Sequence, residues 1–83
     1  MKPIKLHDTV ALLEDFETTQ FMTDNLLVLP KGQVGTVVEI YKNREAYEVE
    51  FSDRNGQTYA LATILPQQLI CLYYEQPCLT PVP

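Results

Sequence analysis

The apolar and polar residues of the chain alternate with a period of two in several short runs, which is typical of β-strands with one buried face. The central run is Lys31–Tyr41, K-G-Q-V-G-T-V-V-E-I-Y. It begins with two glycines and continues into β-branched residues, which pack well on a pleated surface. Both of its faces carry apolar side chains. We therefore predict a strongly bent central strand over Val34–Tyr41, and a bulge at Val37–Val38 is one source of the bend.

The clearest alternation in the chain runs from Glu45 to Phe51, with Glu48 and Glu50 on the outward face. Tight turns are predicted on either side of it, at Lys42–Glu45 and Ser52–Gly56, because Asn and Gly adopt positive φ readily. Other strands are predicted over Asp8–Leu13, Gln57–Ala62 and Leu69–Tyr73, with a single helical turn at Leu65–Leu69. The predicted core is Val10, Leu12, Val38, Ile40, Val49, Phe51, Leu61 and Leu69.

The segment Glu14–Pro30 is the least regular part of the chain. A structureless stretch of this length is unusual in so small a domain, so we predict a folded-back loop or ragged hairpin that covers one end of the fold. Thr23–Asn25 is its expected turn. We expect its apolar residues to be removed from water: Phe16, Phe21, Met22, Leu26, Leu27, Val28 and Leu29.

The order of these elements predicts an all-β fold: a small five-stranded SH3-like barrel with a long first loop and a one-turn helix before the last strand. Closing the sheet would remove exposed strand edges. We assign residues 1–74 to this domain. Residues 75–83 form a Pro-rich tail, in which prolines remove backbone donors and prevent a helix.

The charge of the chain narrows the class of partner. Its net charge is −5 and its pI about 4.6. Nucleic acids and anionic membrane surfaces are therefore disfavoured partners, whereas a basic protein remains compatible, as does simple solubility. No apolar run approaches the roughly 18 residues of a membrane span, and no signal peptide is evident. We expect a cytoplasmic protein, partly because its two cysteines, Cys71 and Cys78, lack metal-binding or redox spacing.

The sequence contains few residues for catalysis. His7 is the only histidine and Ser52 the only serine, and neither has an obvious partner. The carboxylates Glu14, Asp15 and Glu17 are interpreted as a solvated loop edge. The central glycines lack the G-K-[ST] sequence and following helix of a phosphate-binding loop. We expect no catalytic, cofactor-binding or metal-binding residues, no enzyme activity, and free thiols at both cysteines.

The chain could bind another protein through an acidic strand face. Tyrosine beside charge is a common composition of protein interfaces. The alternatives are that these residues are only a solvated sheet face, or that the Glu14–Pro30 segment is the binding surface. The oligomeric state is not specified. The candidate residues of the strand face are Glu39, Glu48, Glu50, Tyr41, Tyr73 and Tyr74.

Four sequence blocks carry a resemblance to a known family: D-T-V-A-L-L-E-D, K-G-Q-V-G-T-V-V-E, Y-E-V-E-F-S-D-R-N-G-Q-T-Y-A-L and P-Q-Q-L. They resemble the small bacterial domain-of-unknown-function family 4926, common in cyanobacteria, over Asp8 to Leu72. The resemblance implies an SH3-like barrel with no established activity. It also suggests an antitoxin-like or immunity-like partner of another small protein; the alternative is a structural or accessory subunit of a larger complex.

Overall fold

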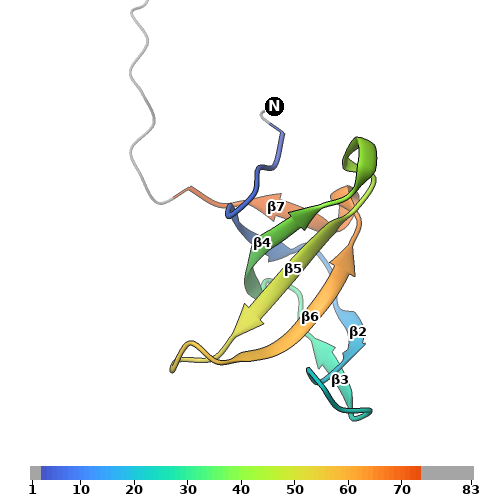
Figure 1. The fold of residues 1–83 in the computed structure, drawn as a ribbon, viewed down its shortest axis with the longest axis vertical. Helices are drawn as coiled ribbons and strands as arrows, with labels where there is room; N and C mark the ends of the chain where they lie inside the picture. The colour runs from blue at the N-terminus through green and yellow to red at the C-terminus, as the bar shows by residue number, and fades with distance from the viewer. Residues whose placement is uncertain (1–2, 74–83) are drawn as a thin grey trace, which may run out of the picture.

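A computed structural model describes residues 3–73 of the chain, and in this part seven antiparallel strands form two sheets (Figure 1). β2 (Phe16–Thr19) and β3 (Leu26–Leu29) pair as a separate hairpin. The prediction of an all-β fold is confirmed. The larger sheet has the order β6-β5-β4-β1-β7, formed by Thr58–Ile64, Tyr47–Ser52, Val34–Ile40, Thr9–Leu12 and Leu69–Cys71.

The Glu14–Pro30 segment contains two strands, so the predicted long first loop is a hairpin. Its turn is closed by the Gln20 N–H, which donates to the Asn25 carbonyl at 2.8 Å. The Thr23 side chain bonds back to the Gln20 carbonyl, as expected of a residue in a turn. The hairpin projects from the lower end of the molecule in Figure 1. The count of five strands was therefore too low.

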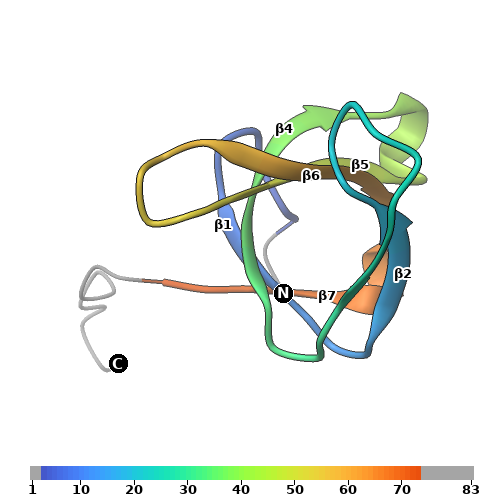
Figure 2. The same cartoon turned by 90° about the horizontal axis from the view of Figure 1, so that it is seen from below.

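The larger sheet is open, and the predicted closure into a barrel is not found among residues 3–73. β6 and β7 are its two edge strands, and no ladder pairs them. The 3₁₀ turn η2 (Pro66–Gln68) connects these two edge strands. It corresponds to the one-turn helix that was predicted before the last strand. The hairpin meets the β6 edge through one main-chain bond, from the Phe21 N–H to the Tyr59 carbonyl at 2.7 Å. Figure 2 shows β2 and β6 on the same side of the domain.

Both predicted tight turns are present. The first contains the 3₁₀ turn η1 (Lys42–Arg44), in which Asn43 has φ 58° and therefore adopts the left-handed region expected of it. In the second, Gly56 has φ 80°. Here the Asp53 carboxylate accepts hydrogen bonds from the N–H groups of Asn55 and Gln57 at 2.8 and 3.0 Å, which fixes the hairpin between β5 and β6.

The bulge in β4 is confirmed, and it changes which valine is buried. The pairing of β4 with β5 shifts between Val37 and Glu39, so Val38 is the extra residue. Val37 is completely buried, whereas Val38 is 36% exposed. Because the bulge reverses the alternation, Gly35 and Val37 face inward before it and Ile40 faces inward after it. The prediction of Val38 as a core residue was wrong for this reason.

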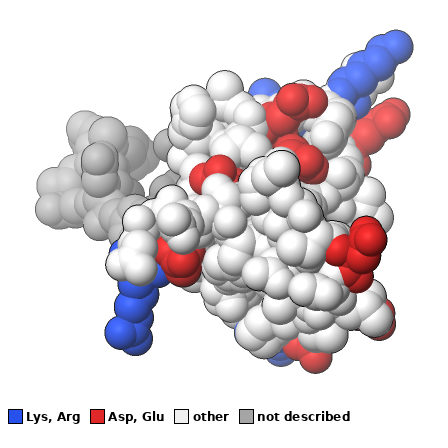
Figure 3. All heavy atoms as spheres, turned by 60° about the horizontal axis from the view of Figure 1, so that its bottom comes forward, with Lys and Arg blue, Asp and Glu red and all other residues white. Residues whose placement is uncertain are grey.

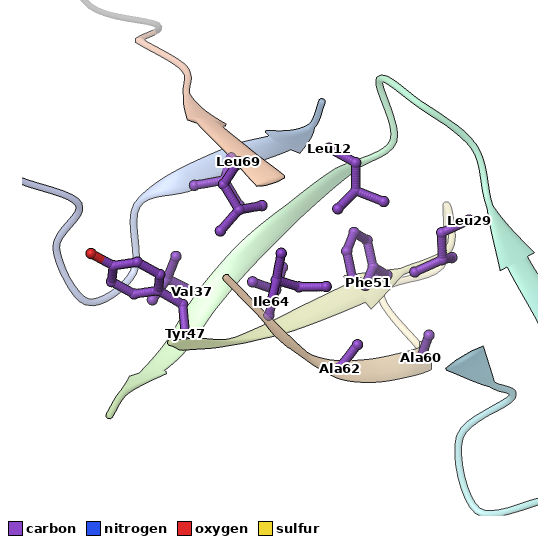
Figure 4. Packing of buried hydrophobic residues seen from close by; sticks show 11 residues of the cluster. Leu12, Leu29, Val37, Tyr47, Phe51, Ala60, Ala62, Ile64 and Leu69 are labelled. Atoms are coloured by element: carbon purple, nitrogen blue, oxygen red, sulfur yellow. The ribbon is translucent and has the colours of Figure 1, made fainter. Parts of the chain in front are cut away.

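The core also differs from the prediction on β6, where Leu61 is exposed and two alanines face inward. Ala60 pairs with Phe51 and Ala62 with Val49. Small side chains at these positions leave space for the Phe51 ring (Figure 4). The buried cluster consists of Val10, Leu12, Leu29, Val37, Tyr47, Val49, Phe51, Ala60, Ala62, Ile64 and Leu69.

Gly35 allows β4 and β5 to approach each other closely. A Cβ atom at this position would lie 2.7 Å from Val49 Cγ1, 2.9 Å from the Glu50 carbonyl oxygen and 2.9 Å from Phe51 Cδ1. Side chains move to relieve such contacts, but the Glu50 carbonyl belongs to the strand ladder and is fixed. The backbone at Gly35 therefore requires the absence of a side chain.

The bulge predicts different costs for truncating two neighbouring valines. Val37→Ala should reduce the free energy of unfolding by about 2–3 kcal/mol, since it removes buried methyl groups and leaves a cavity. Val38→Ala should cost less than about 1 kcal/mol because this side chain is partly in water. Urea unfolding of the two variants measures the difference. A larger loss for Val38→Ala would contradict the register of β4.

Gly35→Ala should reduce the free energy of unfolding by about 1–3 kcal/mol, because the added methyl group overpacks the contact with β5. The neighbouring change Val34→Ala is the control: Val34 lies on the exposed face, so we expect a loss below about 1 kcal/mol. Thermal unfolding followed by circular dichroism compares the two. Equal melting temperatures would show that the close approach at Gly35 is not required.

Candidate functional site

The three predicted carboxylates lie on the outward face of the larger sheet. Glu39 pairs with Glu48 across β4 and β5, and Glu50 follows on the same face of β5. Two of them accept hydrogen bonds from threonines of β6. The Thr63 hydroxyl donates to Glu48 at 2.8 Å, and the Thr58 hydroxyl donates to Glu50 at 2.8 Å. Glu48 and Glu50 therefore link neighbouring strands and are half-buried, whereas Glu39 is exposed.

The two described tyrosines lie at different places relative to these carboxylates. Tyr41 is half-buried directly after β4, where its N–H donates to the Ala46 carbonyl. Tyr73 is 68% exposed and lies just beyond β7, which β1 separates from β4 in the sheet. Tyr74 lies outside the described residues, as do Cys78 and the predicted tail. The structure thus divides the predicted face into two separate regions.

Tyr73 belongs instead to an open hollow of about 560 Å³ beside β7. The hollow contains no charged side chain, so it offers few groups to orient a polar ligand. Its lining residues are Pro3, Ile4, Leu13, Tyr47, Pro66, Leu69, Ile70, Cys71 and Tyr73.

The Cys71 thiol lies at this hollow and donates to the Asp8 carboxylate at 3.5 Å. Burial raises the pKa of the Cys71 thiol, and the hydrogen bond to Asp8 raises it further, against a smaller lowering by Tyr73. The thiolate is the nucleophilic form, so a raised pKa makes Cys71 less reactive at neutral pH than an ordinary thiol. This environment is the opposite of that of a catalytic cysteine.

The other candidates for chemistry are equally dispersed. His7 is exposed, and no group of three or more His, Cys, Asp or Glu side chains within residues 3–73 is arranged to hold a metal ion. Glu14 accepts a hydrogen bond from Gln68, and Asp15 accepts one from the Lys31 N–H at 2.8 Å. In the same part of the chain, every buried side-chain nitrogen or oxygen has a hydrogen-bond partner.

The β2–β3 hairpin carries the most exposed apolar side chains of the described domain. Its register places Phe16, Leu27 and Leu29 on the face that packs on the core. The opposite face, called here the hairpin outer face, consists of Glu17, Thr19, Leu26 and Val28.

On this outer face Leu26 is 79% and Val28 is 56% exposed, and Met22 at the tip is 88% exposed. The prediction that these three side chains are removed from water is wrong, and it is wrong for Phe21 as well, which is 40% exposed. In a hairpin with one face on the core, every second residue of L-L-V-L must face outward. The unbroken apolar run L-L-V-L of β3 was therefore the sequence feature from which the exposed apolar outer face could have been predicted.

The charged side chains of the Glu14–Pro30 segment itself are all negative. Residues 14–30 contain no Lys, Arg or His. Figure 3, in which the lower end of Figure 1 comes forward, shows a broad uncharged surface with Asp and Glu around it, while Lys and Arg lie at the margins of the view. The carboxylates of this segment are Glu14, Asp15, Glu17 and Asp24.

The fold and its surfaces define a small all-β domain with an exposed apolar hairpin bordered by carboxylates. The chain belongs to the family described as domain of unknown function (DUF4926), whose model matches residues 6–71. This confirms the resemblance seen in the sequence. Comparison with curated proteins found no match, and comparison with solved structures found none either. No helix within the described part of the chain is long and apolar enough to span a membrane.

The environment of Cys71 predicts its reactivity. Iodoacetamide should modify it slowly at pH 7, with a rate that rises only at a pH above the ordinary range of thiols, because the pKa is raised. Asp8→Asn should move this rise to lower pH, since the negative charge that disfavours the thiolate is removed. Peptide mapping by mass spectrometry distinguishes Cys71 from Cys78. An unchanged pH profile in Asp8→Asn would contradict this role of Asp8.

Proposed function

We propose that this domain is a protein-binding module, and that the hairpin outer face with Met22 is its contact surface. The observation that carries the proposal is the exposure of Leu26, Val28 and Met22 on one projecting hairpin. Grouped apolar side chains at a surface, bordered by charge, are typical of protein interaction sites.

The acidic strand face is a weaker candidate than the hairpin. Glu48 and Glu50 are occupied by hydrogen bonds to threonines of β6, and a partner would have to replace these bonds. Leu26 and Val28 have no such competing interactions, and burying them gains about 25 cal/mol for each Å² removed from water. This comparison favours the hairpin among the surfaces considered from the sequence.

The strand order supports an open SH3-like barrel as the architecture. The first strand lies between β4 and β7, and a 3₁₀ turn precedes the last strand. In this arrangement the hairpin takes the place of the long first loop. Loops on a rigid scaffold commonly carry binding residues, which agrees with a contact surface on the hairpin.

The expected partner is another protein with basic residues around an apolar contact, bound in the cytoplasm. An antitoxin-like or immunity-like role in a small complex is compatible with such a surface. A second candidate is an accessory subunit that docks permanently through the same hairpin. The high exposure of Met22 and Leu26 favours this second candidate as well, because permanent interfaces are more apolar than transient ones.

The proposal predicts a loss of affinity when the hairpin outer face is made polar. The native partner is first identified by pull-down and mass spectrometry, and binding of the purified pair is then measured. Leu26→Ser with Val28→Ser should raise the Kd at least about tenfold, equivalent to about 1.4 kcal/mol. Raising the salt concentration should slow association more than it speeds dissociation, since carboxylates steer the encounter.

The matched control places the same change on the larger sheet. Val34→Ser alters an exposed valine of β4, which β5 separates from the β6 edge that the hairpin contacts, and should leave the Kd unchanged. If the hairpin variant binds as tightly as the unmodified domain while remaining folded, the hairpin is not the contact surface. A loss of affinity only in Val34→Ser would assign binding to the larger sheet.

A further inference from the structure

The register of the hairpin determines where its main-chain groups point. Gln20 bonds to Asn25, and along an antiparallel ladder bonded and non-bonded pairs alternate. Thr18 and Leu27 are therefore a bonded pair, whereas Thr19 and Leu26 are a non-bonded one. By the same alternation, Leu26 and Val28 direct their N–H and C=O groups away from β2.

The two edges of the hairpin have different surroundings. The outward groups of β2 lie on the side where the Phe21 N–H bonds to Tyr59 of β6. The outward groups of Leu26 and Val28 make no main-chain hydrogen bond within residues 3–73. β3 is thus a free strand edge whose two outward residues also carry exposed apolar side chains. Such an edge is a template for pairing with another strand.

The other strand edges are less available. The β6 edge is occupied at Tyr59 by the hairpin itself. On β7, the Leu69 N–H already bonds to the Pro66 carbonyl in the 3₁₀ turn. Among the strands of residues 3–73, only β3 combines outward main-chain groups that make no hydrogen bond with an exposed apolar face and a wholly negative surrounding segment.

We propose that β3 accepts an additional β-strand from the partner protein; this inference rests on the proposed function and specifies how the partner is recognised. Main-chain bonds to Leu26 and Val28 supply affinity, while side chains alternate along the added strand and supply specificity. The added segment is extended, with apolar side chains facing Leu26 and Val28 and with Lys or Arg flanking them, because the nearby charges at Glu17 and Asp24 are negative.

Synthetic peptides test this mode of binding without knowledge of the natural partner. The parent peptide is acetyl-Lys-Thr-Val-Thr-Val-Thr-Lys-amide, in which lysines and valines share one face of a strand. Two derivatives carry N-methyl groups, one at the valines and the other at the central and flanking threonines. A third derivative has Glu in place of both lysines. Each is titrated into the whole chain labelled with ¹⁵N, and amide shifts are followed by NMR.

Strand addition predicts shifts at the amides of Leu26 and Val28. Only every second N–H of an added strand faces β3, so one N-methylated derivative should bind at least about tenfold more weakly and the other should bind like the parent. The Glu derivative should also bind more weakly. The amides of Leu61 on β6 and Cys71 on β7 are control positions on the other edges and should not shift.

The remaining outcomes overturn the inference. If both N-methylated derivatives bind like the parent, recognition uses side chains alone; the proposed function would stand and strand addition would be wrong. If the shifts occur at Cys71 or Leu61, a different edge accepts the strand. If no peptide shifts Leu26 and Val28, an extended basic segment is not the ligand. Equal binding of the Glu derivative would remove the role of the carboxylates.

Discussion

The contact between Gly35 and β5 is the constraint on which the rest of the structure depends. β4 pairs with both β1 and β5, so its position sets the spacing of the whole sheet. Because Gly35 has no side chain, Phe51 can approach β4 and occupy the middle of the core, in one cluster with Leu12 and Leu29 (Figure 4). A side chain at Gly35 would separate the strands and displace the ring that supports the hairpin.

The outer face of the hairpin is exposed because the hairpin is attached to the rest of the domain by its inner face and its β2 side. Leu29 is buried against the core, and the Phe21 N–H bonds to the edge of β6. A two-stranded hairpin alone is marginally stable, so these anchors on a rigid sheet are what allow it to persist. Only one face of the hairpin can pack on the core, so Leu26 and Val28 are held outward. The packing that stabilises the hairpin thereby exposes the apolar face proposed as the contact surface.

Much of the fold followed from the sequence, because alternation identifies strands and Asn or Gly residues identify turns. Val38 and Leu61 were misplaced for local reasons: a bulge reverses the alternation in β4, and on β6 it is Ala60 and Ala62, opposite Phe51 and Val49, that face the core. The acidic residues of the sheet were found, but hydrogen bonds from Thr58 and Thr63 depend on the register of β6 and are invisible in the sequence. The Glu14–Pro30 segment was an alternative binding surface in the sequence, but the exposure of Leu26 and Val28 depends on the register of the hairpin and was not predicted.

The central claim is that the hairpin, and not the acidic face of the sheet, contacts another protein. Site-specific photo-crosslinking in the source cells tests it most directly, with a photoreactive residue placed at Leu26 in one variant and at Thr63 in another. Both positions are exposed, and Thr63 lies on the acidic face. The account predicts an adduct of one defined mass from position 26 and none from position 63. An adduct from position 63 alone, or equal adducts from both positions, would contradict it.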